Sequence, residues 1–269
     1  MSEFRIDQIT NQAGTAGPQV AGITTFNSPS GLVMPRGDTR GRYSGTDGEI
    51  VKDGLVLWLD AGKTTTYGGD GTTWRDLSGK GNNGTLTNGV GFTADEGGSL
   101  IFDGVNDYIS LGTSNFLTGV SDFTLEMWLY PDDLTIGNYY TFFSYGGYVP
   151  GGWLFQRKGD GTNSFRFAFN GSNLYDTATE FSTTGEWKHI VVTVSGGVPQ
   201  NVYVDSGSQS IGGSGTLSIT TDQIVEIGRR RDTVNQYFDG NIAQVSIYNR
   251  ALTPQEIQQN YNALKGRYI

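Results

Sequence analysis

The chain has 269 residues, a net charge of −9 and no cysteine, and its 41 glycines are about twice the average share. The missing cysteines exclude disulfides and thiolate metal sites, and the acidic balance argues against general nucleic-acid binding, which needs a basic surface. No apolar run approaches the ~20 residues that span a bilayer, so we expect neither nucleic acid nor membrane as a partner.

Residues 1–48 differ in composition from the rest of the chain. Short apolar groups, such as the one around Phe4 and Ile6, are separated by Gly, Thr, Pro and Arg, and no group is long enough to form its own core. Such a segment becomes ordered only against a partner or against its own domain. The sequence therefore predicts an extended N-terminal docking arm over residues 1–48, followed by one domain over residues 49–269.

The stretch that organises this domain is Ser99–Pro131. Residues 99–111 read as two short strands around a turn, and Phe123–Tyr130 alternates strictly between two faces. A strand with one wholly apolar face must lay that face on a second sheet. The apolar face consists of Phe123, Leu125, Met127 and Leu129.

The other predicted strands are short and separated by turns. Gly54–Asp60 reads as a strand, and a long loop is expected over Ala61–Gly91. The phenylalanines of Ser164–Phe169 are expected to face inward, and Gly196–Pro199 reads as a hairpin turn. Further strands are predicted at 139–145, 152–157, 186–195, 200–206, 216–219, 224–228 and 240–249.

One helix is predicted, at the C-terminal end. Thr253 and Glu256 form a capping box around Pro254 at the first helical position. Ile257, Tyr261 and Leu264 follow on one face, and Gly266 can end the helix. These elements predict an all-β fold, a two-sheet antiparallel jelly-roll sandwich with a short C-terminal helix, preceded by the extended arm.

Several segments after residue 53 resemble the laminin-G-like, concanavalin-A-like jelly rolls, and they occur in the order of that family. The pentraxins are more distantly similar. The resemblance implies two curved antiparallel sheets, in agreement with the strand pattern. The segments are GLVLWLD, DLSGKGNNGTL, SLIFDGVNDYISL, FTLEMWLYP, EWKHIVVTVS, VYVDS and FDGNIAQVSIYNRALTPQEIQQNY.

The arm carries a second resemblance. Residues 4–39, FRIDQITNQAGTAGPQVAGITTFNSPSGLVMPRGDT, look like the leader of virion structural proteins of tailed viruses that infect cyanobacteria, and residues 60–86 look like jelly rolls of those viruses. This implies a non-enzymatic virion protein, located in the head decoration, neck, tail or fibre. It would bind other virion structural proteins through residues 1–48, display the jelly roll, and form a homo-oligomer.

Two other functions stay open: a carbohydrate-binding adhesin module for host-surface glycans, and a polysaccharide depolymerase. A retaining glycosidase needs two carboxylates about 5 Å apart, but Glu126 has no acidic partner two or four residues later. The resemblance implies a structural role for His189, and no enzyme is expected. The residues predicted to contact a glycan are Tyr148, Trp153, Arg229, Arg230 and Arg231.

No cofactor is expected from the residues. Calcium stays an open question, because many relatives in the resembled family bind one calcium ion at the rim of the sandwich. Calcium takes six to eight oxygen ligands, and the candidate ligands are Asp76, Asn82, Asp103 and Asp107, with Asn83 and Asn106 nearby. The alternative is that these residues cap tight turns through their own backbone. The basic run Arg229–Arg231 stands where the pentraxins have acidic ligands, which argues against a pentraxin-type site.

Overall fold

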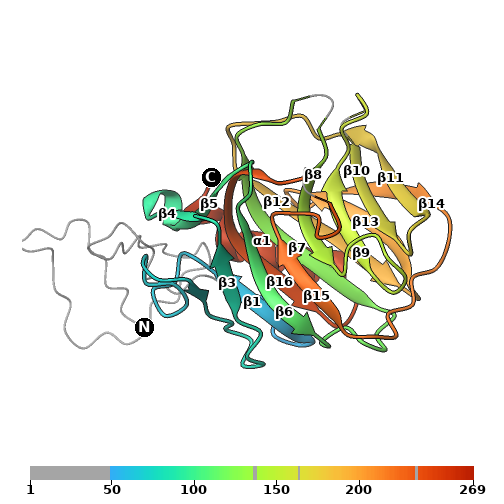
Figure 1. Ribbon diagram of the computed structural model, residues 1–269, viewed down its shortest axis with the longest axis horizontal. Helices are drawn as coiled ribbons and strands as arrows, with labels where there is room; N and C mark the ends of the chain where they lie inside the picture. The colour runs from blue at the N-terminus through green and yellow to red at the C-terminus, as the bar shows by residue number, and fades with distance from the viewer. Residues whose placement is uncertain (1–48, 136–137, 163, 234–235) are drawn as a thin grey trace, which may run out of the picture. The chain divides into compact units, whose positions relative to one another are not determined.

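The computed structural model describes residues 49–135, 138–162, 164–233 and 236–269. The arm predicted over residues 1–48 lies outside these ranges. The described domain is built from antiparallel strands and carries one α-helix near its C-terminal end, as the strand pattern predicted (Figure 1).

The first sheet has the order β4-β5-β16-β7-β12-β13-β14, and β1 also pairs with β16. Its central strand β7 lies between β12 and β16 over almost its whole length. The strands are β1 (Leu55–Asp60), β4 (Gly91–Thr93), β5 (Ser99–Asp103), β7 (Phe123–Pro131), β12 (Lys188–Ser195), β13 (Val198–Val204), β14 (Gly207–Gly213) and β16 (Asp239–Tyr248).

The second sheet has the order β2-β3-β6-β15-β8-β9-β10-β11-β14. Strand β14 belongs to both sheets, since residues 207–210 pair with β13 and residues 211–213 pair with β11. A strand that bends from one sheet into the other closes one side of a sandwich. The remaining strands are β2 (Thr73–Trp74), β3 (Gly84–Thr87), β6 (Tyr108–Ser114), β8 (Tyr140–Tyr145), β9 (Trp153–Arg157), β10 (Ser164–Phe169), β11 (Asn173–Glu180) and β15 (Gln223–Ile227).

The core lies between the two sheets. The predicted apolar face of β7 is confirmed, because its four side chains are at most 1% exposed and belong to one cluster with side chains of the second sheet. Phe123 of β7 stacks on Trp153 of β9, with ring centroids 5.0 Å apart. Phe165, Phe167 and Phe169 of β10 also point into this core, as their alternation predicted.

The outer face of the first sheet is covered by helix α1 (Pro254–Leu264) and the following 3-10 turn η2 (Lys265–Arg267). The capping box is confirmed, since Thr253 and Glu256 exchange side-chain and backbone hydrogen bonds. Ile257 and Leu264 are buried in a second apolar cluster with Trp128 of β7. The helix ends at Leu264, and Gly266 lies inside η2 without acting as the helix terminator.

Some predicted elements differ from the structure. The expected loop over 61–91 contains β2 and β3, and residues 216–219 form no strand. Strands β11 and β14 were missed because polar residues and glycine interrupt their alternation. The hairpin turn between β12 and β13 consists only of Gly196 and Gly197, and the strand already includes Pro199.

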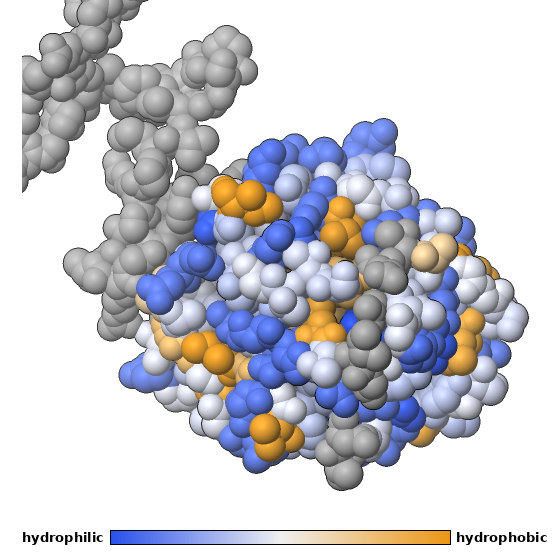
Figure 2. All heavy atoms as spheres, turned by 90° about the horizontal axis from the view of Figure 1, so that it is seen from above, coloured by the Kyte–Doolittle hydropathy of each residue, from blue (hydrophilic) through white to orange (hydrophobic). Residues whose placement is uncertain are grey.

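The surface is polar, with isolated apolar residues. Figure 2 shows small orange patches separated by hydrophilic residues on the face in view. The large hydrophobic side chains that are exposed in the described part of the chain are Ile101, Val105 and Ile269. No helix in the described ranges has the length and apolar character needed to cross a bilayer.

Candidate functional site

The outer face of the second sheet carries a pocket of about 240 Å³, here called the outer-sheet pocket. Its floor consists of two rows of side chains that run across neighbouring strands. In the apolar row, Ala168 of β10 lies opposite Leu154 of β9 and Leu174 of β11. In the polar row, Arg166 lies opposite Gln156 and Asp176 on the same two strands. Among the residues that the structure describes, the lining consists of Tyr139, Tyr148, Leu154, Gln156, Arg166, Ala168, Leu174, Arg230 and Gln236.

Strand alternation explains why these residues face outward. Side chains on a strand point alternately to the two faces of the sheet, and Phe165, Phe167 and Phe169 occupy the core. Arg166 and Ala168 between them must therefore face out. The same alternation in β9 directs Trp153 and Phe155 inward, and Leu154 and Gln156 outward.

The walls of the pocket come from loops. Tyr139 precedes β8 and Tyr148 follows it, while Arg230 and Gln236 lie between β15 and β16. The guanidinium carbon of Arg230 lies 5.3 Å from the ring centroid of Tyr148. Tyr148 is only partly buried, so its ring keeps surface for a ligand.

Each cation at the pocket has a carboxylate partner. Arg166 donates to Asp176 through Nε at 2.7 Å and through Nη2 at 2.8 Å. Lys158 lies 3.0 Å from Asp176 and 2.7 Å from Asp160. Arg230 holds Asp232 in the same bidentate way, at 2.7 and 2.8 Å. The site therefore contains three cations and three carboxylates, and its charges balance.

These pairs also determine the ionisation of the groups. Burial works against the charged form of Asp176, but hydrogen bonds from Arg166 and Lys158 outweigh it and hold the pKa of this carboxyl below its usual value. Burial raises the pKa of Tyr148, although the charges of Arg166 and Arg230 act in the opposite direction. The phenol is therefore neutral near pH 7 and both donates and accepts hydrogen bonds.

Two buried oxygens at this face have hydrogen-bonding capacity left over. Oε1 of Gln236 lines the pocket and has no hydrogen-bond partner among the described residues. Oγ of Ser144, which lies opposite Leu154 on β8, is also buried without a partner there. A buried polar group is normally hydrogen-bonded, but both atoms are closed to solvent and Ser144 does not line the pocket, so they are not counted as ligand contacts.

The predicted glycan residues divide into two groups. Tyr148 and Arg230 line the outer-sheet pocket together. Arg229 instead holds the buried Glu226 at 2.7 and 2.8 Å and covers the ring of Tyr108 at 3.5 Å. Arg231 is exposed and lies 3.9 Å from Glu226. Neither Arg229 nor Arg231 lines the pocket.

Trp153 does not belong to any ligand surface. Its side chain is 0% exposed and lies in the core, where it stacks on Phe143 at 5.1 Å and on Phe167 at 5.2 Å. A ring without exposed surface cannot stack on a sugar that arrives from solvent. The prediction that Trp153 contacts a glycan is therefore wrong. Trp153 is the first residue of β9, and its side chain points into the core.

Four of the polar or aromatic pocket residues were not identified from the sequence, namely Tyr139, Gln156, Arg166 and Gln236. Arg166 lies at an outward position between Phe165 and Phe167, and Gln156 follows the inward Phe155, so strand alternation predicts that both face outward. Tyr139 lies at the start of the strand predicted over 139–145 and was not among the predicted glycan contacts. Gln236 lies in an irregular loop, and no local pattern identifies it.

The calcium candidates use their oxygens to hold their own turns. Asp76 accepts backbone hydrogen bonds from Trp58 at 2.9 Å, Ser78 at 2.8 Å and Asn82 at 3.0 Å. The Asn82 amide donates to Val56 O at 2.9 Å.

The second turn is organised in the same way. Asp103 accepts from the backbone N–H groups of Val105 and Asn106 at 2.9 and 3.2 Å, and Asp107 accepts from that of Asp103 at 3.2 Å. Oδ1 of Asp107 stays buried without a partner. Across the described ranges, no three His, Cys, Asp or Glu side chains gather in a way that could hold a metal ion. The four candidates therefore act as turn caps in this structure.

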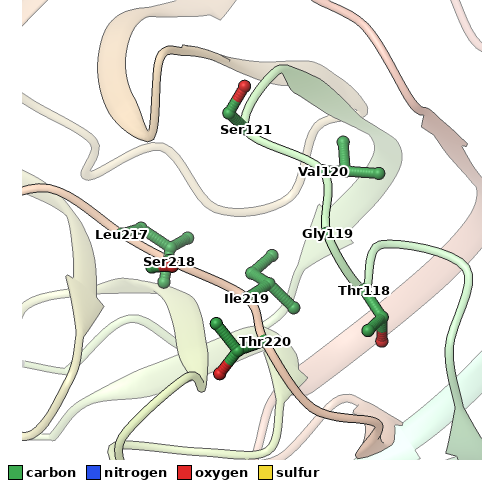
Figure 3. A pocket seen from close by; sticks show the side chains of 8 residues that line it. All are labelled: Thr118, Gly119, Val120, Ser121, Leu217, Ser218, Ile219 and Thr220. Atoms are coloured by element: carbon green, nitrogen blue, oxygen red, sulfur yellow. The ribbon is translucent and has the colours of Figure 1, made fainter.

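A second hollow lies between two loop segments at one end of the domain, and Figure 3 shows it from close by. Residues 118–121 and 217–220 run past each other there, joined by a hydrogen bond from Gly119 N–H to Ile219 O at 2.7 Å. The labelled side chains are small, apolar or hydroxylated, and none is charged. This hollow offers little chemistry for recognition compared with the outer-sheet pocket.

The buried carboxylates near both sheets are already bound by basic or amide groups. Glu226 on the outer face of the second sheet is paired with Arg229. Glu126 on the first sheet is buried beneath α1, where it contacts His189 at 2.6 Å and Asn260 at 2.7 Å. Glycoside hydrolysis uses two carboxyl groups at a fixed separation. None of the groups that bind Glu126 or Glu226 in these contacts is a second carboxyl.

Solved structures with the same fold come from several kinds of protein. The sialidase of Trypanosoma rangeli in complex with sialic acid aligns with a TM-score of 0.59 at 18% identity, over 80% of this chain and 34% of the sialidase. Domain 4 of AbnA, an extracellular arabinanase from Geobacillus stearothermophilus, in complex with arabinotriose, aligns with 0.59 at 21% identity, over 77% and 98%. The binding domain of Paraclostridial Mosquitocidal Protein 1 aligns with 0.58 at 19% identity, over 79% and 52%.

The chain spans about a third of the length of the sialidases it matches, and no curated protein sequence matches it. At these identities the structural likeness demonstrates a common fold. A family model for the concanavalin A-like lectin/glucanases superfamily matches residues 102–258, which is more than half of the chain. The chain therefore belongs to the concanavalin A-like lectin/glucanases superfamily.

Proposed function

We propose that residues 49–269 form a non-enzymatic carbohydrate-binding module, and that the outer-sheet pocket is its binding site. The observation that carries the proposal is the combination of an apolar row of side chains, two partly exposed tyrosines and the partly exposed Gln236 in one concave site. Concave sites with apolar lining and a few placed polar groups bind small ligands, and a tyrosine offers a flat apolar ring with a polar tip.

The charge of the pocket favours a neutral sugar. Arg166, Arg230 and Lys158 are each neutralised by their own carboxylate, so an anionic ligand would have to compete with Asp176 and Asp232. The volume of about 240 Å³ is below the about 300–1,000 Å³ of typical drug-sized sites. One or two sugar rings therefore fit better than an extended segment of polysaccharide.

The arabinanase domain supports this choice, because the alignment with this chain covers 98% of that domain and the domain was solved in complex with arabinotriose. A short, uncharged oligosaccharide is accordingly the first ligand class to test. Such a module would act as an adhesin for host-surface glycans.

The absence of catalysis is part of the proposal. Hydrolysis needs a carboxyl that can donate or accept a proton at the sugar. Asp176 is occupied by Arg166 and Lys158, and Glu226 is occupied by Arg229. Purified protein is expected to release no reducing ends from host polysaccharide, which separates this function from a depolymerase.

The test is glycan-array screening followed by calorimetry with the strongest neutral oligosaccharide. Tyr148→Ala and Arg230→Ala should each weaken binding by about tenfold or more. Two variants serve as matched controls: Tyr108→Ala removes a ring outside the pocket, and Arg231→Ala removes the neighbouring arginine. Binding that is equally sensitive to the control pair, or no binding to any neutral glycan, would exclude the pocket as the site.

We further propose that the module is displayed on a virus particle, bound to other virion structural proteins through residues 1–48. The support is the resemblance of that leader, which lies outside the described residues. Deletion of residues 1–48 should leave a folded domain that no longer enters particles, and electron microscopy of labelled full-length protein should locate it on the virion. Normal incorporation of the shortened protein would end this proposal and leave the glycan site unaffected.

A further inference from the structure

A second concave site lies on the opposite side of the sandwich, over the outer face of the first sheet. This C-terminal pocket has a volume of about 420 Å³. Aromatic side chains from three separate parts of the chain line it: Tyr130 at the end of β7, Trp187 just before β12, and Tyr261 and Tyr268 from the C-terminal helix and the residues after it.

The rings form a wall at several angles. Tyr130 meets Trp187 nearly edge to face, with an interplanar angle of 62° and centroids 5.6 Å apart. Tyr268 lies on Trp187 at 4.7 Å with an angle of 37°. Trp187 is almost completely buried, while Tyr130, Tyr261 and Tyr268 each keep part of their surface exposed. Trp187 therefore belongs to the floor, and the three tyrosines form the accessible wall.

Carboxylates surround this wall. Glu96, Glu186 and Asp205 line the pocket, and Lys188 is the one cation in the lining described there. Lys188 is already bound by two of the acids, at 2.9 Å from Glu186 and 3.1 Å from Asp205. Among the described side chains of the lining, three carboxylates against one ammonium leave an excess of two negative charges. Lys265 lies outside the lining, with its ammonium 5.4 Å from the ring centroid of Tyr261. Glu96 in addition accepts a hydrogen bond from the Trp187 indole N–H.

Aromatic faces and negative charge together select cations. A ring face attracts a positive group within about 6 Å of its centroid, and the attraction is strongest when the cation is weakly hydrated, as in quaternary ammonium groups. A carboxylate beside the rings adds a Coulombic attraction of the same sign. A neutral sugar or an anion would gain nothing from the excess charge.

We propose that the C-terminal pocket binds a small organic cation that carries a methylated ammonium group. Tyr130, Tyr261 and Tyr268 contact its methyl groups, and Glu96 supplies the carboxylate of the lining that is not paired with Lys188. This site is separate from the outer-sheet pocket and belongs to a different sheet. Occupancy of one pocket does not depend on ligand in the other.

The probe is choline, compared with its neutral analogue in which a carbon atom replaces the nitrogen. Binding is followed by NMR of the tryptophan indole N–H signals, of which the chain has five. The Trp187 signal is assigned with Trp187→Phe. Choline should shift the Trp187 signal and bind at least about tenfold more tightly than the neutral analogue, and added salt should weaken it. Equal binding of both compounds, or no shift of the Trp187 signal, would overturn the proposal.

Two pairs of variants locate the site. Glu96→Gln keeps an acceptor for the Trp187 indole and removes the charge, so binding should weaken about threefold to tenfold. Asp95→Asn removes the same charge from the adjacent residue, which does not line the pocket, and should change binding by less than about twofold. Tyr130→Leu removes the aromatic ring and should weaken choline binding about as much as Glu96→Gln does. Tyr130→Phe keeps the ring and should bind choline as the wild type does. Identical affinities across all four variants would place choline elsewhere and contradict the proposal.

Discussion

Nε2 of His189 lies 2.6 Å from Oε1 of Glu126, and both side chains are shielded from solvent beneath helix α1. The second oxygen of Glu126 accepts a hydrogen bond of 2.7 Å from Asn260 of that helix. Asn260 in turn contacts the phenol of Tyr248 at 3.0 Å and accepts from Val51 N–H at 2.8 Å. The Glu126 carboxylate therefore links β7, β12 and α1 in a site that is closed to solvent.

Removal of this carboxylate should strongly destabilise the domain. Glu126→Ala leaves the His189 and Asn260 groups buried without their acceptor, and breaking such a buried pair typically lowers the free energy of unfolding by about 3–5 kcal/mol. Chemical denaturation followed by tryptophan fluorescence measures the change. Asp70→Ala, at an exposed acid, should stay within about 0.5 kcal/mol of the wild type. A loss at Glu126 no larger than the loss at Asp70 would show that the helix does not depend on this contact.

The pair of Asp60 and Arg267 predicts a second large effect. The guanidinium donates to both carboxylate oxygens at 2.8 and 2.9 Å, and neither side chain is more than 1% exposed. Arg267→Met leaves Asp60 as an uncompensated buried charge and should cost about 3–5 kcal/mol. The double variant Asp60→Asn/Arg267→Met should recover part of this loss, with a coupling of about 0.5–3 kcal/mol in a double-mutant cycle. Strictly additive losses would contradict the predicted coupling.

The two glycines of the β12–β13 hairpin should differ in how they tolerate alanine. Both have positive φ, +59° for Gly196 and +73° for Gly197, as a two-residue turn of this type requires. A Cβ on Gly196 meets nothing within 4 Å, whereas one on Gly197 would lie 2.2 Å from Leu217 O. Gly196→Ala should lower stability by about 1–2 kcal/mol, the cost of a left-handed conformation for an L-residue, and Gly197→Ala should lower it clearly more. Equal decreases in melting temperature for the two variants would mean that the backbone around Leu217 moves to make room for the added methyl group.

The capping glutamate of α1 should make part of the stability depend on acid pH. Hydrogen bonds from Arg250 lower the pKa of Glu256 from 4.5 to about 2, although burial opposes this. Because the folded-state pKa is depressed, the stabilisation is complete above the unfolded value and is lost as pH falls from 4.5 towards 2. Glu256→Gln should flatten the stability profile over that interval, and Arg250→Gln should do the same by removing the partner. An unchanged acid slope in both variants would show that this pair contributes nothing.

The balance of charges in the outer-sheet pocket predicts a change of ligand preference. Asp176→Asn keeps the size of the side chain but leaves Arg166 and Lys158 without their shared carboxylate. The pocket then carries an extra positive charge, so an acidic oligosaccharide should gain about threefold to tenfold in affinity relative to its neutral counterpart. Calorimetry with a matched pair of uronic-acid and neutral oligosaccharides measures the ratio. A ratio that does not move would mean that the ligand binds away from Arg166.

Much of the fold could be predicted from local patterns. The alternation in Phe123–Tyr130 identified the central strand and its buried face, and the capping box located the start of α1. Both signals depend on neighbours within four residues. Strands β11 and β14 gave no such signal, because their pairing depends on distant partners and their own residues are largely polar or glycine.

The candidate site was only partly accessible to the same reasoning. Tyr148 and Arg230 were identified by residue type, but Trp153 was assigned to the wrong face of β9 and Arg166 was not considered. Residue type indicates what a side chain can bind. The face it occupies depends on the strand register, which partner strands set through their hydrogen bonds.

The amino-acid sequence by itself determined the class of fold, the family and the starts of the central strand and the helix, because these follow from periodicity and capping over short distances. Only the tertiary structure decided which side chains share a pocket, since that depends on the order of strands in two sheets and on loops that meet from opposite ends of the chain. Arg166 and Arg230 lie 64 positions apart in the sequence, and they line one pocket because β15, β8, β9 and β10 follow one another in the same sheet.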